Sequence, residues 1–139
     1  MTPARIGASV EVRNRQRRKV NTERLRQLAE SLNTTGLTLS IVLVSDRQMA
    51  SLNLQYHHVA GPTDILTFDY GEGQGELIIS VDHAVSQARR YRSTPARELD
   101  LYVIHGLLHL RGYDDRTPAQ RRRMRAAERR LLARFARSG

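Results

Sequence analysis

The most apolar run of the chain, from Leu99 to Leu110, is the feature that most constrains how the chain can fold. It has no proline, reaches its first glycine at Gly106 and is too long for an ordinary strand, so it predicts a buried helix. His105 and His109 lie within it, four residues apart. This spacing puts both imidazoles on one face of the helix, one turn apart. Gly112 follows where a left-handed turn is expected to end the helix.

The two histidines predict a metal site. Imidazoles at this spacing can bind one ion, as in the HExxH helix of zinc proteases. Beyond the glycine turn the chain can fold back and offer Asp114 or Asp115 as a third ligand. A His-His-carboxylate set leaves positions open for water and substrate, as a catalytic metal requires. The alternative is that both histidines only pack or form hydrogen bonds, although burying imidazoles without partners is costly.

Four motifs along the chain can be compared with those of known families. In chain order they are Leu52-Asn53 before Tyr56, Pro62-Thr63-Asp64-Ile65-Leu66-Thr67-Phe68, Gly75-Glu76-Leu77-Ile78-Ile79-Ser80, and His105-Gly-Leu-Leu-His109-Leu-Arg-Gly-Tyr-Asp-Asp115. They resemble motifs of the YbeY family of bacterial endoribonucleases, which are ribosomal RNA maturation factors. The family reads L-N-x-x-Y-R, P-T-D-V-L-S-F, G-D-I-x-I-S and H-G-x-L-H-L-x-G-Y-D-H. Met124 and Glu128 also stand where the family has them, so the resemblance covers roughly Ser45 to Leu132.

The resemblance implies a metal-dependent endoribonuclease, specific for single strands, that acts in ribosomal RNA maturation and small-subunit assembly. It implies one divalent transition metal ion, with Zn²⁺ favoured, held by His105, His109 and Asp115. The chain departs from the family at two positions. Asp115 replaces the third metal histidine and supplies a harder oxygen donor. His57 replaces the active-site arginine; it lacks the guanidinium fork and, unlike arginine, is not a permanently charged side chain.

Two residues outside the metal motif are the catalytic candidates, His57 and Asp64. Adjacent side chains on a helix diverge by about 100°, so His57 and His58 cannot easily reach one ion together. The resemblance implies that His57 faces the substrate phosphate, and His58 is expected at the surface. A carboxylate near the ion, from Asp64 or Glu76, could orient or deprotonate the attacking water. The alternative is that Asp64 only caps a turn and Glu76 is an edge residue.

The net charge of +9 is unevenly distributed. Residues 1–40 carry eight Lys or Arg against three acids and residues 111–139 carry ten against three, whereas residues 41–110 carry five against eight. Basic ends around an acidic centre suit a polyanion such as RNA. Arg121, Arg122 and Arg125 in the last helix are therefore candidate RNA-backbone contacts. Alternatively they form a solvated face, and the arginine bias, broken only by Lys19, reflects genomic base composition.

The pattern of residues predicts an α+β domain over residues 1–139. The resemblance implies a small mixed β-sheet packed by helices, about four strands and five helices in all, with the metal helix central. Alternating apolar residues predict a first strand containing Ile6, Ala8, Val10 and Val12, and a central strand from Leu37 to Val44. Asp64–Tyr70 and Glu76–Val81 are expected to form a hairpin around the intervening glycines.

Helix starts are indicated by capping residues at Asn21 or Thr22, Ser45, Ser80 or Asp82, Thr94 and Thr117, and the last helix is expected to end near Phe135. In the second helix, Met49, Leu52 and Tyr56 are expected to face inward.

The absence of cysteines, of a run of about 20 apolar residues and of an apolar N-terminal signal leads us to expect a cytoplasmic protein that binds no membrane. Single-stranded or ribosomal RNA, and proteins of the small ribosomal subunit, are the expected partners. Two other functions remain open at this point. One is an RNA-binding assembly factor whose catalysis is weakened by the changes at His57 and Asp115. The other is a metallopeptidase, against which Gly106 counts because it occupies the position of the HExxH glutamate.

Overall fold

The computed structural model describes residues 9–33 and 35–138, and within them it contains four strands and five helices. In chain order these are β1 (Val10–Asn14), α1 (Thr22–Leu32), β2 (Thr38–Val44), α2 (Asp46–His57), β3 (Ile65–Gly71), β4 (Gln74–Ser80), α3 (Val81–Arg90), α4 (Pro95–Leu110) and α5 (Pro118–Ser138). The predicted α+β class and the predicted mixed sheet are confirmed. Ile6 and Ala8, expected in the first strand, lie outside the described residues.

The sheet has the strand order β1-β2-β4-β3. β1, β2 and β4 are parallel, and β3 runs antiparallel to β4 as the expected hairpin. Gly71 and Gly73 in the connecting turn have φ of +77° and +75°, which glycine adopts without steric cost. β2 is an interior strand, as its apolar far end predicted. β3 is an edge strand, so one of its sides is open to the surroundings.

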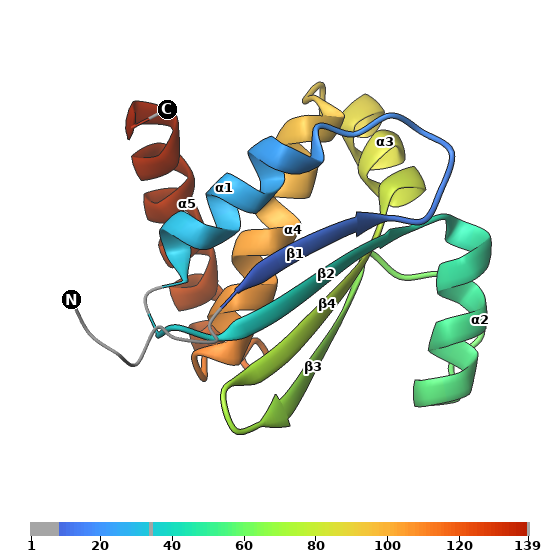
Figure 1. Cartoon of the computed structure of the whole chain (residues 1–139), viewed down its shortest axis with the longest axis horizontal. Helices are drawn as coiled ribbons and strands as arrows, with labels where there is room; N and C mark the ends of the chain where they lie inside the picture. Colours follow the sequence, from blue (N-terminus) through green and yellow to red (C-terminus); the bar gives the residue numbers. More distant parts are fainter. Residues whose placement is uncertain (1–8, 34, 139) are drawn as a thin grey trace.

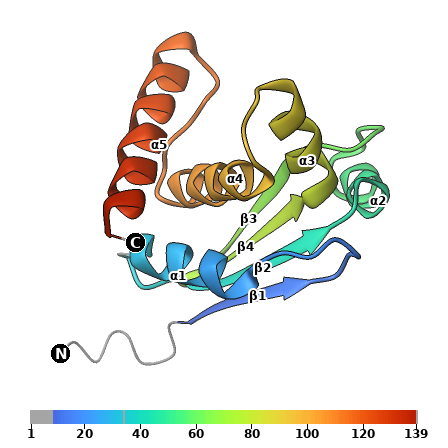
Figure 2. The same cartoon turned by 90° about the horizontal axis from the view of Figure 1, so that it is seen from above.

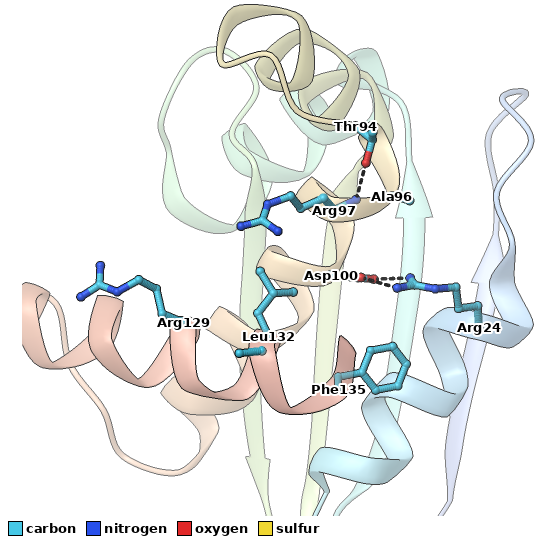
Figure 3. A pocket seen from close by; sticks show the side chains of 9 residues that line it. Arg24, Thr94, Ala96, Arg97, Asp100, Arg129, Leu132 and Phe135 are labelled. Carbon is cyan, nitrogen blue, oxygen red and sulfur yellow. Dashed lines mark hydrogen bonds and ion pairs between the residues drawn. The ribbon is translucent and has the colours of Figure 1, made fainter. Parts of the chain in front are cut away.

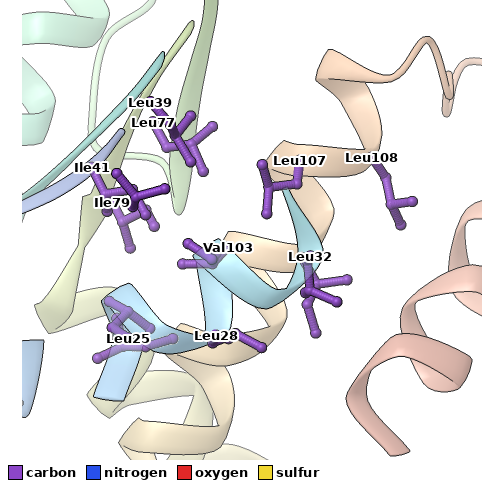
Figure 4. Close-up of a cluster of buried hydrophobic side chains, with 14 of the residues drawn as sticks. Leu25, Leu28, Leu32, Leu39, Ile41, Leu77, Ile79, Val103, Leu107 and Leu108 are labelled. Carbon is purple, nitrogen blue, oxygen red and sulfur yellow. The ribbon is translucent and has the colours of Figure 1, made fainter. Parts of the chain in front are cut away.

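The helices cover the two faces of the sheet unequally (Figures 1 and 2). α1, α3 and α4 pack on one face, and α5 packs on α4 and α1 outside them. The main core lies between this helical layer and the sheet, where Leu28, Ile41, Leu77 and Val103 are fully buried (Figure 4). On the opposite face α2 covers a smaller apolar cluster of Val42, Val44, Met49, Leu66 and Ile78.

Local capping signals set the predicted helix starts. The Ser45 side chain accepts from the backbone N–H of Gln48 while the Gln48 side chain accepts from that of Ser45, which completes a capping box at α2. Thr94 caps α4 ahead of Pro95. The prediction for Tyr56 was wrong: its side chain is 54% exposed, because it lies at the end of α2, where its ring meets the edge strand at the partly buried ring of Phe68.

An ion pair ties α1 to α4. The guanidinium of Arg24 donates two 2.8 Å hydrogen bonds to Asp100, whose side chain is 4% exposed (Figure 3). This bond raises the pKa of Arg24, so the arginine stays charged and compensates a carboxylate that burial would otherwise destabilise. Among the described residues, no helix has the length and apolar character needed to cross a membrane.

Two glycines allow α4 to lie close against the sheet. A Cβ on Gly106 would stand 2.5 Å from Cδ2 of Leu77 and 2.9 Å from Cδ1 of Ile65, distances that real Cβ atoms do not adopt. A Cβ on Gly75 of β4 would stand 2.9 Å from Cδ1 of Leu110. The glycine between the two histidines is thus required by packing. This close approach places the last turns of α4 directly beside β3 and β4.

We predict that Gly106→Ala lowers the stability of the protein. In an exposed helix the same change would stabilise by about 1 kcal/mol through helix propensity. Here the added methyl group overpacks the contact with Leu77, which we expect to cost about 1–3 kcal/mol. Urea unfolding followed by circular dichroism measures the change. A gain in stability would show that the contact at Gly106 is not tight.

Candidate metal centre

The three predicted metal ligands, His105, His109 and Asp115, lie together at the end of α4. Nε2 of His105 lies 3.1 Å from Nε2 of His109, and Oδ2 of Asp115 lies 3.6 Å and 3.4 Å from these two atoms. All three side chains are partly buried. Among the described residues, only these three form a group of His, Cys, Asp or Glu side chains whose donor atoms lie close enough together to share one ion.

The turn after α4 brings Asp115 to the histidines. Gly112 has a φ of +101°, and the backbone N–H groups of Gly112 and Tyr113 donate to the carbonyls of His109 and Leu108, which ends the helix. The spacing alone allowed Asp114 or Asp115 as the third ligand, and the family resemblance predicted Asp115. The structure separates them, because Oδ1 of Asp114 accepts from the backbone N–H of Asp115 and holds the turn instead.

Arg121 supports the same turn from α5. Its guanidinium donates to the backbone carbonyls of Asp115, at 3.3 Å, and of Arg116, at 3.1 Å. Arg121 was predicted as an RNA contact, and the structure gives it this additional contact within the chain. The side chains of Arg122 and Arg125 are exposed on α5.

Glu128 is the site residue that the sequence reasoning missed as part of the metal centre. Its Oε2 lies 2.8 Å from Nδ1 of His105, with its side chain 16% exposed. A carboxylate at this place fixes the ring orientation and the tautomer, so that Nε2 presents its lone pair to the other donors. The available signal was its position one helical turn after the buried Met124 and next to Ala127, on the apolar face of α5.

The surroundings of His105 favour its protonated form. Burial alone would lower the pKa of this imidazole, but the hydrogen bond and charge of Glu128, with the charges of Asp115 and Asp64, outweigh burial and raise the pKa. The same carboxylates attract any cation at this place. A metal ion would therefore replace a proton and gain the electrostatic attraction that now favours the imidazolium.

The geometry fits a small divalent ion. A tetrahedral zinc ion with bonds of about 2.0–2.2 Å separates its donor atoms by about 3.3–3.6 Å. The three observed separations of 3.1, 3.4 and 3.6 Å are close to these values. Three protein donors leave at least one coordination position for water or substrate, as in catalytic sites.

A cleft of about 600 Å³ adjoins the three donors. His57 from the end of α2 and Asp64 at the start of β3 line it together with His105, His109 and Asp115. The structure thus gathers both catalytic candidates around the candidate metal centre.

Further polar groups surround these candidates. One oxygen of Asp64 accepts hydrogen bonds from its neighbours, the backbone N–H of Ile65 and the hydroxyl of Thr63. Arg116 also lines the cleft, with its side chain 85% exposed. Glu76, the other acidic candidate, instead binds the hydroxyls of Tyr70 and Ser40.

Comparison with known proteins then shows to which family the chain belongs. A model of the endoribonuclease YbeY family matches residues 7–136. The chain belongs to the endoribonuclease YbeY family. The family resemblance predicted from the four sequence motifs is therefore confirmed over almost the whole chain.

Individual members of the YbeY family show the extent of the similarity. An endoribonuclease YbeY from Symbiobacterium thermophilum is 35% identical over 124 residues, covering 80% of each chain. One from Geobacter metallireducens is 34% identical and covers 94% of this chain and 97% of its own. A Thermotoga maritima protein solved in solution shares the fold, with a TM-score of 0.65 at 24% identity over 91% of this chain and 88% of its own.

We predict that Glu128→Gln weakens metal binding while the cluster itself remains intact. Replacing the carboxylate that orients a ligating histidine typically costs about 10- to 100-fold in metal affinity. Titration of the metal-free protein with zinc in the presence of a competing chromogenic chelator measures this loss. Arg125→Gln, an exposed change on the same helix, is the control and should leave the affinity unchanged.

The raised pKa of His105 predicts how metal binding depends on pH. Only the neutral imidazole binds a metal, so apparent affinity falls as pH decreases through the pKa of His105. Because that pKa is raised, the loss should begin at a higher pH than for an ordinary histidine, which titrates near pH ~6.5. In Glu128→Gln the onset should shift to lower pH. The same zinc titration repeated over a pH series tests both statements.

Proposed function

We propose that the chain is a metal-dependent endoribonuclease, specific for single strands, that acts in ribosomal RNA maturation and small-subunit assembly. The observation that carries the proposal is the cluster of His105, His109 and Asp115 at the edge of a cleft that also contains Asp64 and His57. Family membership supplies the reaction class, since the relatives are named endoribonucleases.

The donor set supports one divalent transition metal ion, with Zn²⁺ favoured by the two imidazoles and the fitting donor separations. The carboxylate of Asp115 in place of a third imidazole also suits manganese, iron or cobalt. When bound, such an ion supplies an activated water and polarises a phosphate oxygen. Glu128 would hold His105 in the tautomer whose Nε2 is free to ligate.

Asp64 and His57 carry the proton and phosphate steps in this proposal. The Asp64 carboxylate accepts the proton of the attacking water, since it lines the cleft beside the donors and its charge already acts on His105. His57 donates a hydrogen bond to a non-bridging phosphate oxygen. Arg116, whose guanidinium is exposed at the same cleft, adds the fixed positive charge that His57 lacks.

Further proposals concern the RNA contacts outside the cleft, the partners, the compartment and the extent of the domain. Arg121, Arg122 and Arg125 on α5 would contact the RNA backbone beyond the cleft. We propose ribosomal RNA and proteins of the small subunit as partners, and the cytoplasm as the place of action. Residues 1–139 would act as one domain, because α1, α4 and α5 share a hydrophobic core with the sheet.

Two alternatives can be weighed against the structure. An RNA-binding assembly factor with weakened catalysis is favoured by one observation: His57 stands where the family resemblance implies an arginine. A metallopeptidase of the HExxH type is disfavoured by packing, because at the position of the glutamate even a Cβ on Gly106 would stand 2.5 Å from Leu77.

We predict that His109→Ala loses both bound metal and RNA cleavage while the fold survives. The imidazole is one of three donors and is partly exposed at the end of α4, so its loss removes a ligand without opening the core. Elemental analysis of purified protein should find about one equivalent of metal in the wild type and none in the variant. Cleavage of a labelled single-stranded RNA is then measured with the same preparations.

The control for this experiment is His58→Asn. It also removes one imidazole, and asparagine tolerates the left-handed conformation of His58, whose φ is +57°. This variant should retain the metal and the activity. Full cleavage by His109→Ala would refute the proposed site. Metal binding by the wild type without RNA cleavage would support the assembly factor instead.

A further inference from the structure

Four aromatic side chains form a continuous row at the edge of the sheet, from Tyr56 and His57 at the end of α2 to Phe68 and Tyr70 on β3. The rings of His57 and Tyr70 both lie nearly parallel to the Phe68 ring, at 16° and 3°, with centroids 6.4 Å and 6.0 Å away. Tyr56 meets Phe68 edge-on at 5.4 Å. We call these four side chains the aromatic row.

The aromatic row begins at the cleft and continues on the opposite face of β3. Side chains alternate along a strand. Thr67 and Asp69 line the cleft, whereas Phe68 packs against the cluster under α2. His57 is part of both the cleft lining and the aromatic row, because it lines the cleft and its ring stacks against the ring of Phe68. A polymer leaving the cleft over the open edge of β3 would therefore meet the aromatic row next.

Tyr56, His57 and Tyr70 of the aromatic row are exposed, and Phe68 is partly buried. Tyr70 is 60% and Tyr56 54% exposed, although burial of these rings would be favourable. The hydroxyl of Tyr70 donates a 2.7 Å hydrogen bond to Glu76, which raises the pKa of Tyr70 to about 12 and keeps the phenol neutral. Rings that are fixed before binding lose little conformational entropy when a partner stacks on them.

We propose that the aromatic row stacks the unpaired bases of an RNA strand whose phosphates occupy the cleft, and that it contributes the preference for single strands. The inference rests on the proposed function. Every base has an aromatic face, so stacking is tolerant of sequence. In a duplex those faces are covered by neighbouring base pairs. Both histidine and arginine side chains stack on bases, so His57 retains this capacity where the family resemblance implies an arginine.

The test compares two substitutions of Tyr70, whose side chain is 60% exposed. Tyr70→Leu removes the ring, and Tyr70→Phe keeps it while losing the same hydrogen bond to Glu76. Tyr91→Leu removes a ring of similar exposure, 64%, beyond the end of α3. Fluorescence anisotropy measures binding of a labelled single-stranded RNA, and of an abasic strand of equal length and charge. A chelator is present so that the RNA is not cleaved.

We expect Tyr70→Leu to weaken binding of the base-bearing RNA by about 5- to 100-fold, the range found for loss of one stacked base. Tyr70→Phe should lose much less affinity than Tyr70→Leu, because the ring remains, and Tyr91→Leu should bind like the wild type. The abasic strand should bind more weakly to the wild type and should not distinguish the variants. Equal losses on both strands, or no loss in Tyr70→Leu, would overturn the inference.

Cleavage assays with metal separate this inference from the proposed function. If Tyr70→Leu raises the KM for single-stranded RNA with kcat unchanged, the aromatic row acts in substrate binding as proposed. If the wild type cleaves RNA and Tyr70→Leu has an unchanged KM, the nuclease stands and the aromatic row is refuted. If the wild type binds in the base-dependent way described above and does not cleave, the aromatic row stands and the nuclease is refuted.

Discussion

The close packing of α4 against the sheet is the contact on which the rest of the site depends. With hydrogen atoms as side chains, Gly106 and Gly75 let the helix approach β4 until Leu77 and Leu110 fill the space. The histidines at positions 105 and 109 flank Gly106, so this approach sets their height above the sheet. A helix held farther away would carry both imidazoles away from the edge strand and from Asp64. The glycine that replaces a protease glutamate is therefore part of how this metal centre is built.

The candidate metal centre is assembled from segments that act on one another. The turn after α4 presents Asp115, and the carboxylate of Asp114 and the guanidinium of Arg121 hold that turn. α5 contributes Glu128, which orients His105 from the side away from Asp115. The position of α5 is in turn fixed by its packing on α4 and α1. Stability of the helical layer and readiness of the site to bind a metal are thus linked.

The edge strand β3 relates the chemistry to the binding surface. On one face it presents Thr67 and Asp69 to the cleft, and on the other it carries the partly buried Phe68 and the exposed Tyr70. His57 joins the two faces at the end of α2. An unpaired strand edge is usually protected from association with other chains by charge or by a covering segment. Here it lies between the cleft and the aromatic row, where a bound nucleic acid would cover it.

Much of this protein could be predicted from sequence because the relevant signals are local. Capping residues such as Ser45 and Thr94 act within three residues, helical spacing alone puts His105 beside His109, and the glycines around position 73 allow the hairpin. Spacing alone could not separate Asp115 from Asp114, because both directly follow the same turn, and the prediction of Asp115 came from the family resemblance. The contact of Glu128 with His105 was not predicted, because the two residues are 23 positions apart in the chain and lie on different helices. By itself, the sequence determined the elements and the candidate donors, since those follow from short-range periodicity and hydrogen bonding. Only the tertiary structure decided which carboxylates reach the histidines, because that depends on how α5 and the turn pack against α4.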